Sequence, residues 1–257
     1  INFAAGRYMQ GARKRREVNM KRELEYFRIG GSWGGNQSWF FDFMMRIGGC
    51  GAVTACDCCI YFARYRGMEN LYPANARKVA RRDFIRFAKV MKPYLRPRKG
   101  GIDTLELYID GFSEYLRSVG EERISMQGLS GNCSYREAAR AVRKQIESGL
   151  PVPCLTLRHS DPQMEDYVWH WFLLTGYDCA DSDGRDGEST DASEARNRQA
   201  KTTESGSRGE YSTETVFSAM KVKAVTYGEY RWIDFERLWD TGFAKRGGLI
   251  LFDAPPV

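Results

Sequence analysis

The spacing of apolar residues changes near residue 150, and this change limits the folds that the chain can adopt. Before it, apolar residues recur every three or four positions, which predicts helices with one buried face. The predicted helices cover residues 52–66, 76–94, 104–119 and 134–148. After it, short apolar segments bounded by turn residues predict strands. The predicted strands cover residues 151–159, 167–177, 216–227, 230–235 and 247–254. Helices followed by an antiparallel sheet indicate an α+β fold, in which an N-terminal helical half packs on a C-terminal sheet.

We expect one domain over residues 1–257, because no linker separates the two halves, although the same order of elements also fits two domains. Residues 1–26 are predicted to be an N-terminal arm, either helix or tail. Residues 28–51 are rich in glycine and aromatic side chains, which predicts a loop. Residues 180–215 have almost no large apolar side chains, so we expect a flexible polar insertion there.

The composition argues against several classes of protein. No apolar run approaches the roughly 20 residues of a membrane helix, so we expect no membrane partner. The net charge of +6 comes with no RNA-binding or zinc-finger signature, so we interpret the basic clusters as solvated helix faces and expect no nucleic acid. The seven cysteines are an odd number, which is a poor disulfide framework and favours a reducing, cytoplasmic compartment. Because the chain begins at Ile1, we expect that its natural start is missing or processed.

Cys50 lies in a Gly-Gly-Cys-Gly sequence directly before the predicted helix 52–66. Unpaired N–H groups and the positive end of the helix dipole favour thiolate there, and thiolate is the nucleophilic form. The same N–H groups can bind the oxyanion of a tetrahedral intermediate, and the flanking glycines let a substrate approach the backbone. Cys50 is therefore a candidate nucleophile, and the alternative is a small buried filler. That alternative is predicted for the other six cysteines, which are Cys56, Cys58, Cys59, Cys133, Cys154 and Cys179.

Histidine is scarce, since the chain has only His159 and His170. His159 lies at a strand end before a turn, whereas His170 lies inside a predicted strand between Trp169 and Trp171, which alternation directs to the opposite face. A core histidine with one hydrogen-bond partner is the structural alternative for His170. An early cysteine at a helix start and a strand histidine far downstream follow the order of papain-like peptidases.

Three segments carry a resemblance to a known family: GGNQSWFFDFMMRIGGCGAVTACDCC, VWHWFLLTGYD and AVTYGEYRWIDFERLW. Together they resemble bacterial papain-like cysteine peptidases of the double-glycine-leader (bacteriocin-processing) type, and more closely peptidase-like proteins of gut Firmicutes. The resemblance covers the chain from Gly34 to Phe252. It implies a papain-like fold, hydrolysis of peptide or amide bonds without a cofactor, and a peptide or protein substrate.

Carried over to this chain, the resemblance implies that Cys50 is the nucleophile and His170 the general base. The family also has an upstream amide that helps to form the oxyanion hole. In papain that glutamine lies six residues before the cysteine, a position that Met44 holds here. The nearest amides are Asn36 and Gln37, and Gln37 is the preferred candidate.

The third catalytic position departs from the family pattern. The family holds the histidine with Asn or Asp on the next strand, but the matching stretch here is KAVTYG, and its candidate is Thr226. Asp178 and Asp234 are nearby acids outside that position. A hydroxyl orients an imidazole but supplies no charge to stabilise imidazolium. The site is therefore a dyad, or has an unexpected third residue, or is impaired.

Rival functions remain open from the sequence. Acyl transfer uses the same catalytic groups as hydrolysis. A catalytically impaired descendant of the fold would bind a peptide or protein partner. A metal site built from Cys56, Cys58, Cys59 and His170 lacks a second cysteine pair at zinc-site spacing. Nucleic-acid binding through the basic helices is the last alternative.

Overall fold

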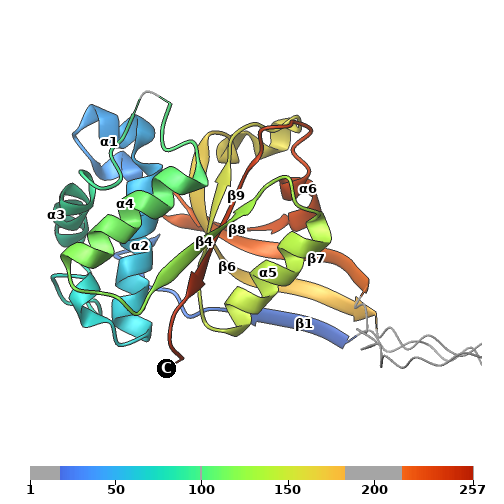
Figure 1. The fold of residues 1–257 in the computed structure, drawn as a ribbon, viewed down its shortest axis with the longest axis horizontal. Coiled ribbons are helices and arrows are strands. Elements are labelled where there is room, and N and C mark those ends of the chain that lie inside the picture. The colour runs from blue at the N-terminus through green and yellow to red at the C-terminus, as the bar shows by residue number, and fades with distance from the viewer. Residues whose placement is uncertain (1–17, 99, 183–215, 257) are drawn as a thin grey trace, which may run out of the picture.

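Helices and sheet occupy opposite halves of the structure (Figure 1). The computed structural model describes residues 18–98, 100–182 and 216–256. The helical half contains α1 (Phe43–Gly48), α2 (Cys50–Tyr65), α3 (Arg81–Met91) and α4 (Leu105–Ser118). Helices α5 (Tyr135–Glu147) and α6 (Phe235–Trp239) lie with the sheet. The prediction of an α+β architecture is confirmed, with a helical N-terminal half and a C-terminal antiparallel sheet.

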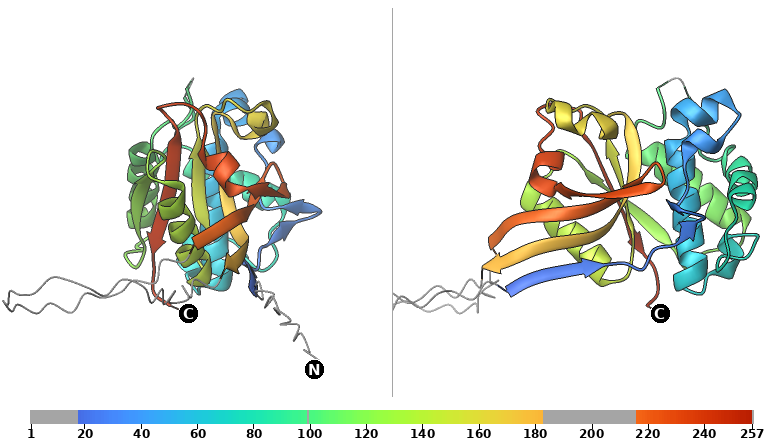
Figure 2. Two further views of the ribbon diagram at one scale, coloured as in Figure 1. Left: turned by 90° about the vertical axis from the view of Figure 1, so that its right-hand side faces the viewer. Right: turned by 180° about the vertical axis from the view of Figure 1, so that it is seen from behind.

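The sheet has the strand order β4-β9-β5-β6-β7-β8, and every neighbouring pair is antiparallel. Strand β1 pairs with the later part of β6, beyond the part that pairs with β5, so both lie along one edge of β6 (Figure 2). A separate hairpin joins β2 (Arg28–Ile29) to β3 (Ser32–Trp33). The strands of the main sheet are β1 (Val18–Glu23), β4 (Ser125–Ser130), β5 (Val152–Thr156), β6 (His170–Ser182), β7 (Val216–Thr226), β8 (Glu229–Asp234) and β9 (Gly247–Asp253).

Helix α2 connects the two halves. The prediction of a single buried face is wrong for this helix, because every residue from Cys50 to Ala63 is buried, the polar Thr54 and Asp57 included. It packs against α3 on one side and against β6 on the other. Its first residue therefore lies where the helical half meets the sheet. No helix in the described ranges is both long enough and apolar enough to span a bilayer.

The helix boundaries follow local signals. The predictions for 104–119 and 134–148 agree with α4 and α5 to within one residue at each end. Helix α3 is shorter than the predicted 76–94, because Asn75 accepts the Arg77 N–H at 2.9 Å and holds that segment in a turn.

Several predicted elements are wrong. Residues 18–23 of the predicted arm form strand β1 instead of helix or tail, because β6 provides a pairing edge. The predicted loop 28–51 contains a hairpin, a 3-10 turn η1 (Gln37–Trp39), helix α1 and the start of α2. The predicted strand 167–177 begins only at His170, after the 3-10 turn η3 (Pro162–Tyr167).

Two further regions differ from the predictions or lie outside the description. Strand β4 was not predicted, because its pairing with β9 depends on distant residues and its own sequence, SMQGLS, has little apolar alternation. Of the predicted insertion 180–215, residues 180–182 extend β6 and the rest lies outside the described residues, as do residues 1–17 of the arm.

Helix α5 provides a test of the capping signal in the sequence. The Ser134 hydroxyl accepts the N–H of Glu137 at 3.2 Å. We expect Ser134→Ala to lower the free energy of unfolding by about 1 kcal/mol, whereas Ser134→Asp, which keeps an acceptor, lowers it by less. Urea denaturation of both variants measures this difference, and equal losses would contradict the capping role.

Candidate active site

One pocket at the seam between the halves brings together residues that are distant in the sequence. Four of the five predicted site residues line it: Gln37, Cys50, His170 and Thr226. The fifth, Asn36, is not among its lining residues. Among the other lining residues, the sequence analysis missed two with ionisable side chains, Asp57 of α2 and Tyr227 of the β7–β8 turn. Helix α2, the start of β6, the β7–β8 turn and the segment before η1 thus meet at one place.

Cys50 is the first residue of α2, and only 6% of its surface is exposed. The glycines around Cys50 lie where a side chain would crowd neighbouring atoms of the protein. A Cβ atom at Gly49 would lie 2.3 Å from the Met45 carbonyl oxygen, and one at Gly51 would lie 3.0 Å from Ile102 Cδ1. These glycines therefore allow α1 to turn directly into α2 and let α2 pack, which explains them without a substrate.

Burial outweighs the helix N-terminus at the Cys50 thiol. Burial raises the pKa of Cys50, while the backbone N–H groups of Trp171, Gly51 and Cys50 itself act to lower it. The net shift is upward, so the thiol form prevails at neutral pH. The expectation that the helix start would favour thiolate is wrong for this structure. The contribution of Trp171 N–H shows that the sulfur lies against the backbone of β6 next to His170.

His170 has a hydroxyl group at each ring nitrogen. Its Nε2 lies 2.5 Å from Thr226 Oγ1, and its Nδ1 lies 3.3 Å from the Tyr227 hydroxyl. The Tyr227 ring also stacks on the imidazole, with 4.4 Å between centroids and 7° between planes. When Tyr227 donates to Nδ1, Nε2 carries the ring proton and donates to Thr226 Oγ1.

The His170 imidazole is neutral at neutral pH. Only 4% of its surface is exposed, and burial lowers the pKa of His170 to about 4 against an opposing effect of the Asp166 charge. Burial likewise raises the pKa of Tyr227 to about 12, so that its hydroxyl keeps its proton and can donate. Hydroxyl partners suit such an imidazole because they need no countercharge.

Two unusual backbone conformations set the positions of these side chains. Trp169 has a φ of 52°, and its side chain is half exposed although its neighbour Trp171 is buried. Trp169 lies outside β6, so the predicted alternation of the two tryptophans about His170 does not extend to it. Tyr227 and Gly228 have φ values of 52° and 80°. Positive φ at both central residues is typical of the two-residue hairpin turn whose twist matches that of the flanking strands. This turn directs the Tyr227 side chain toward His170.

The two candidate amides have different surroundings. Gln37 Nε2 donates to the Arg46 carbonyl at 3.2 Å, and Gln37 Oε1 is buried without a partner among the described residues. Because Nε2 has two hydrogens, one remains for the pocket. Asn36 Oδ1 accepts the Ser38 N–H at 2.8 Å, and Asn36 Nδ2 donates to the Tyr227 carbonyl at 2.5 Å. Asn36 thus ties its segment to the β7–β8 turn.

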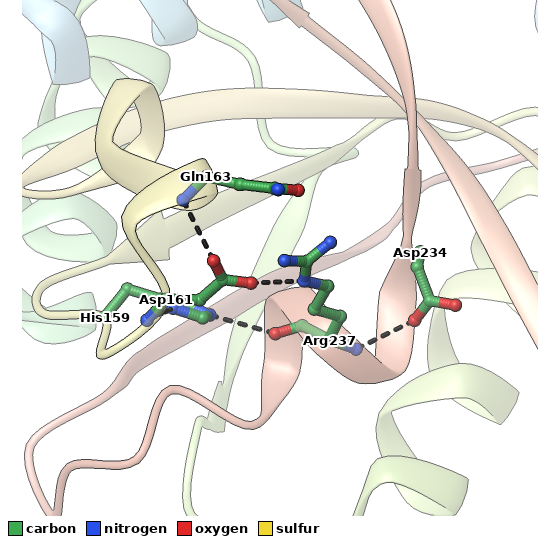
Figure 3. Close-up of polar contacts among 5 residues, drawn as sticks. All are labelled: His159, Asp161, Gln163, Asp234 and Arg237. Atoms are coloured by element: carbon green, nitrogen blue, oxygen red, sulfur yellow. Dashed lines mark hydrogen bonds and ion pairs between the residues drawn. The ribbon is translucent and has the colours of Figure 1, made fainter.

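His159 belongs to a separate polar cluster (Figure 3). Its Nε2 donates to the Arg237 carbonyl at 2.9 Å, while its Nδ1 accepts the Asp161 N–H at 3.0 Å. Asp161 also forms an ion pair with Arg237 and accepts the Gln163 N–H at 2.9 Å. Asp234, one of the nearby acids, caps α6 by accepting the Arg237 N–H at 2.8 Å. The cluster joins the loop before η3 to α6 and lies outside the pocket.

The remaining cysteines have no comparable setting, and the prediction that all six are buried is wrong for Cys133, which is only partly buried. None of the seven cysteines forms a disulfide, and Cys56, Cys58 and Cys59 are completely buried. Burial raises the pKa of each of these three thiols well above its usual value. Within the part of the chain that the structure describes, no three His, Cys, Asp or Glu side chains gather as metal ligands. The hypothesis of a metal site at Cys56, Cys58 and Cys59 has no support.

Comparison with family models, curated proteins and solved structures finds no match. The likeness to papain-like peptidases therefore depends on the three sequence segments alone.

The separation of the two histidines can be tested. We expect His159→Ala to lower the free energy of unfolding by about 1–2 kcal/mol, because it removes one hydrogen bond that joins the loop before η3 to α6 and one that holds the loop itself. The rate at which iodoacetamide alkylates Cys50 should not change. Urea denaturation and mass spectrometry of the alkylated protein measure these quantities, and altered Cys50 alkylation would contradict the assignment of His159 to a separate cluster.

Proposed function

We propose that the chain is a papain-like cysteine peptidase or amide hydrolase that acts through Cys50 and His170. The observation that carries the proposal is that a thiol, an imidazole and an amide with a spare N–H line one pocket. A peptide or protein is the proposed substrate, and no cofactor enters the reaction. The absence of a disulfide among the seven cysteines fits a compartment that keeps cysteines reduced, such as the cytoplasm.

The reaction begins when a substrate enters and displaces the Tyr227 hydroxyl from His170 Nδ1. Thr226 continues to hold Nε2, so Nδ1 is the nitrogen that accepts the Cys50 proton. The Cys50 sulfur then attacks the substrate carbonyl carbon. The carbonyl oxygen becomes an oxyanion, which the Cys50 backbone N–H and the second Gln37 Nε2 hydrogen stabilise.

The second half of the reaction restores the enzyme. His170 Nδ1 returns its proton to the leaving nitrogen, the carbon–nitrogen bond breaks, and a thioester of Cys50 remains. Water then loses a proton to His170 and attacks the thioester. The carboxylic acid product leaves as the sulfur regains its proton. Thr226 keeps the imidazole oriented throughout but supplies no charge, so imidazolium is less stable here than beside a carboxylate.

A second candidate is a peptide-binding protein that has lost catalysis. Burial raises the pKa of Cys50 and lowers that of His170, so both shifts oppose the thiolate–imidazolium pair. This protein would keep the pocket but would turn over no peptide or amide. Reactivity of Cys50 separates the two candidates.

Alkylation by iodoacetamide at pH 7.5, mapped by mass spectrometry, tests the proposed pair. Cys133 serves as an internal reference, because it is the one cysteine that is only partly buried. We expect Cys50 to react faster than Cys133 despite its greater burial, and His170→Ala to slow Cys50 by about a hundredfold. His159→Ala is the matched control. Equal reaction of Cys50 in wild type and His170→Ala would rule out the hydrolase.

Tyr227 provides a second test, since its hydroxyl competes with the thiol for His170 Nδ1. We expect Tyr227→Phe to speed alkylation of Cys50 by about threefold to tenfold, the equivalent of one neutral hydrogen bond, while the ring stays stacked. Tyr230→Phe on the same hairpin is the control and should have no effect. A slower reaction in Tyr227→Phe would contradict competition and would instead indicate that the hydroxyl assists proton transfer.

A further inference from the structure

Asp57 is a buried acid in the same pocket as Cys50. It lies two turns further along α2, and only 5% of its surface is exposed. Its partners are neutral groups: the Tyr26 hydroxyl donates to Oδ2 at 2.9 Å, and the Gly35 N–H points to both carboxylate oxygens at 2.9 and 3.2 Å. Burying a carboxylate without a cation is destabilising unless hydrogen bonds offset the cost, as those from Tyr26 and Gly35 do in part here. The segment that these hydrogen bonds hold therefore indicates the role of Asp57.

What Asp57 holds is the segment of residues 34–37, which ends at the oxyanion candidate Gln37. The segment packs closely against its surroundings at two glycines. A Cβ atom at Gly34 would lie 2.2 Å from Asp57 Oδ2, and one at Gly35 would lie 1.9 Å from Phe84 Cζ. Gly34 also has a φ of 63°, which favours glycine. The backbone of the segment therefore lies close enough to α2 for the Asp57 carboxylate to accept its N–H group.

The other hydrogen bonds of the segment reach different elements. The Gly34 N–H donates to the Phe27 carbonyl at 3.2 Å, Asn36 donates to the β7–β8 turn, and Gln37 donates to the Arg46 carbonyl. Among these contacts, only that of Asp57 ties the segment to the helix that carries Cys50.

We propose that Asp57 is a positioning residue of the site, which fixes the segment 34–37 on α2 and so holds the Gln37 amide at the oxyanion position beside Cys50. The inference rests on the proposed function. It predicts that Asp57 acts on the step that forms an oxyanion and not on the formation of thiolate.

The protonation state of Asp57 gives this role a pH signature. Burial raises the pKa of Asp57 to about 7, while its hydrogen bonds with Tyr26 and Gly35 act to lower it. The titratable groups that face it are Tyr26 from the loop before β2, Cys56 and Cys58 of α2, and Cys50 and His170 across the pocket. The carboxylate accepts at both oxygens, whereas the acid must use one oxygen as a donor. The hydrogen bonding by which Asp57 holds the segment 34–37 is therefore strongest above about pH 7.

Two reagents separate the steps. Iodoacetamide alkylates the sulfur by displacement and forms no oxyanion, whereas p-nitrophenyl acetate acylates it through a tetrahedral oxyanion. We expect Asp57→Ala to lower the rate of Cys50 acylation by about tenfold to a hundredfold and to keep alkylation within about twofold. Asp110→Ala, which changes an exposed acid on α4, should alter neither rate. Equal losses in both reactions would overturn the inference.

A double variant tests whether Asp57 acts through Gln37. If it does, Asp57→Ala has no further effect on acylation once Gln37→Ala is present. A full further loss in the Gln37→Ala background would overturn the inference.

Asp57→Asn keeps an acceptor for Gly35 but cannot titrate, so it remains informative if Asp57→Ala does not fold. We expect its acylation rate at pH 7.5 to stay within about threefold of wild type. The ratio of acylation to alkylation should rise through about pH 7 in wild type and stay flat in Asp57→Asn. An unchanged rise in Asp57→Asn would overturn the inference while the proposed hydrolase stands. Loss of the His170 dependence of alkylation would instead remove the proposed function itself.

Discussion

Burial of helix α2 from Cys50 to Ala63 is the constraint on which the candidate site depends. Because α3 and β6 cover it, its first turn lies inside the seam and not at the surface. Cys50 therefore experiences two opposing effects: N–H groups at the helix start favour thiolate, and desolvation favours thiol. Desolvation is the larger effect, so the thiol stays neutral. A helix N-terminus activates a cysteine only where water or a countercharge limits the cost of burial.

Burial also determines the charge state of the other ionisable groups in the pocket. Burial lowers the pKa of His170 and raises that of Asp57, so each group is shifted toward its neutral form. Thr226 and Tyr227 are then appropriate partners for the imidazole, since a carboxylate in place of Thr226 would raise the His170 pKa and would itself require stabilisation. The hydroxyl partners and the lowered His170 pKa thus both keep this pocket low in charge.

The sequence predicted what depends on local pattern. Periodicity located α2, α4 and α5, and the order of Cys50, His170 and Thr226 anticipated that they would line one pocket. It missed what depends on distant pairing: β1 and β4 exist because β6 and β9 offer edges. Asp57 was overlooked because its partners, Tyr26 and Gly35, approach from another segment, and Tyr227 because its aim is set by a hairpin turn. Side-chain types alone do not encode those approaches.

The segment before η1 links the two sides of the pocket. The Trp33 N–H donates to the Gly228 carbonyl at 2.7 Å, and Asn36 holds the Tyr227 carbonyl, so the segment is fixed to the turn that faces His170. Asp57 fixes the same segment to the helix that carries Cys50. Gln37, at the end of this segment, is therefore attached both to the helix that begins with Cys50 and to the turn that faces His170. Under the proposed function, a shift of the β7–β8 turn that frees His170 Nδ1 would also move the segment that carries Gln37, because hydrogen bonds join the two.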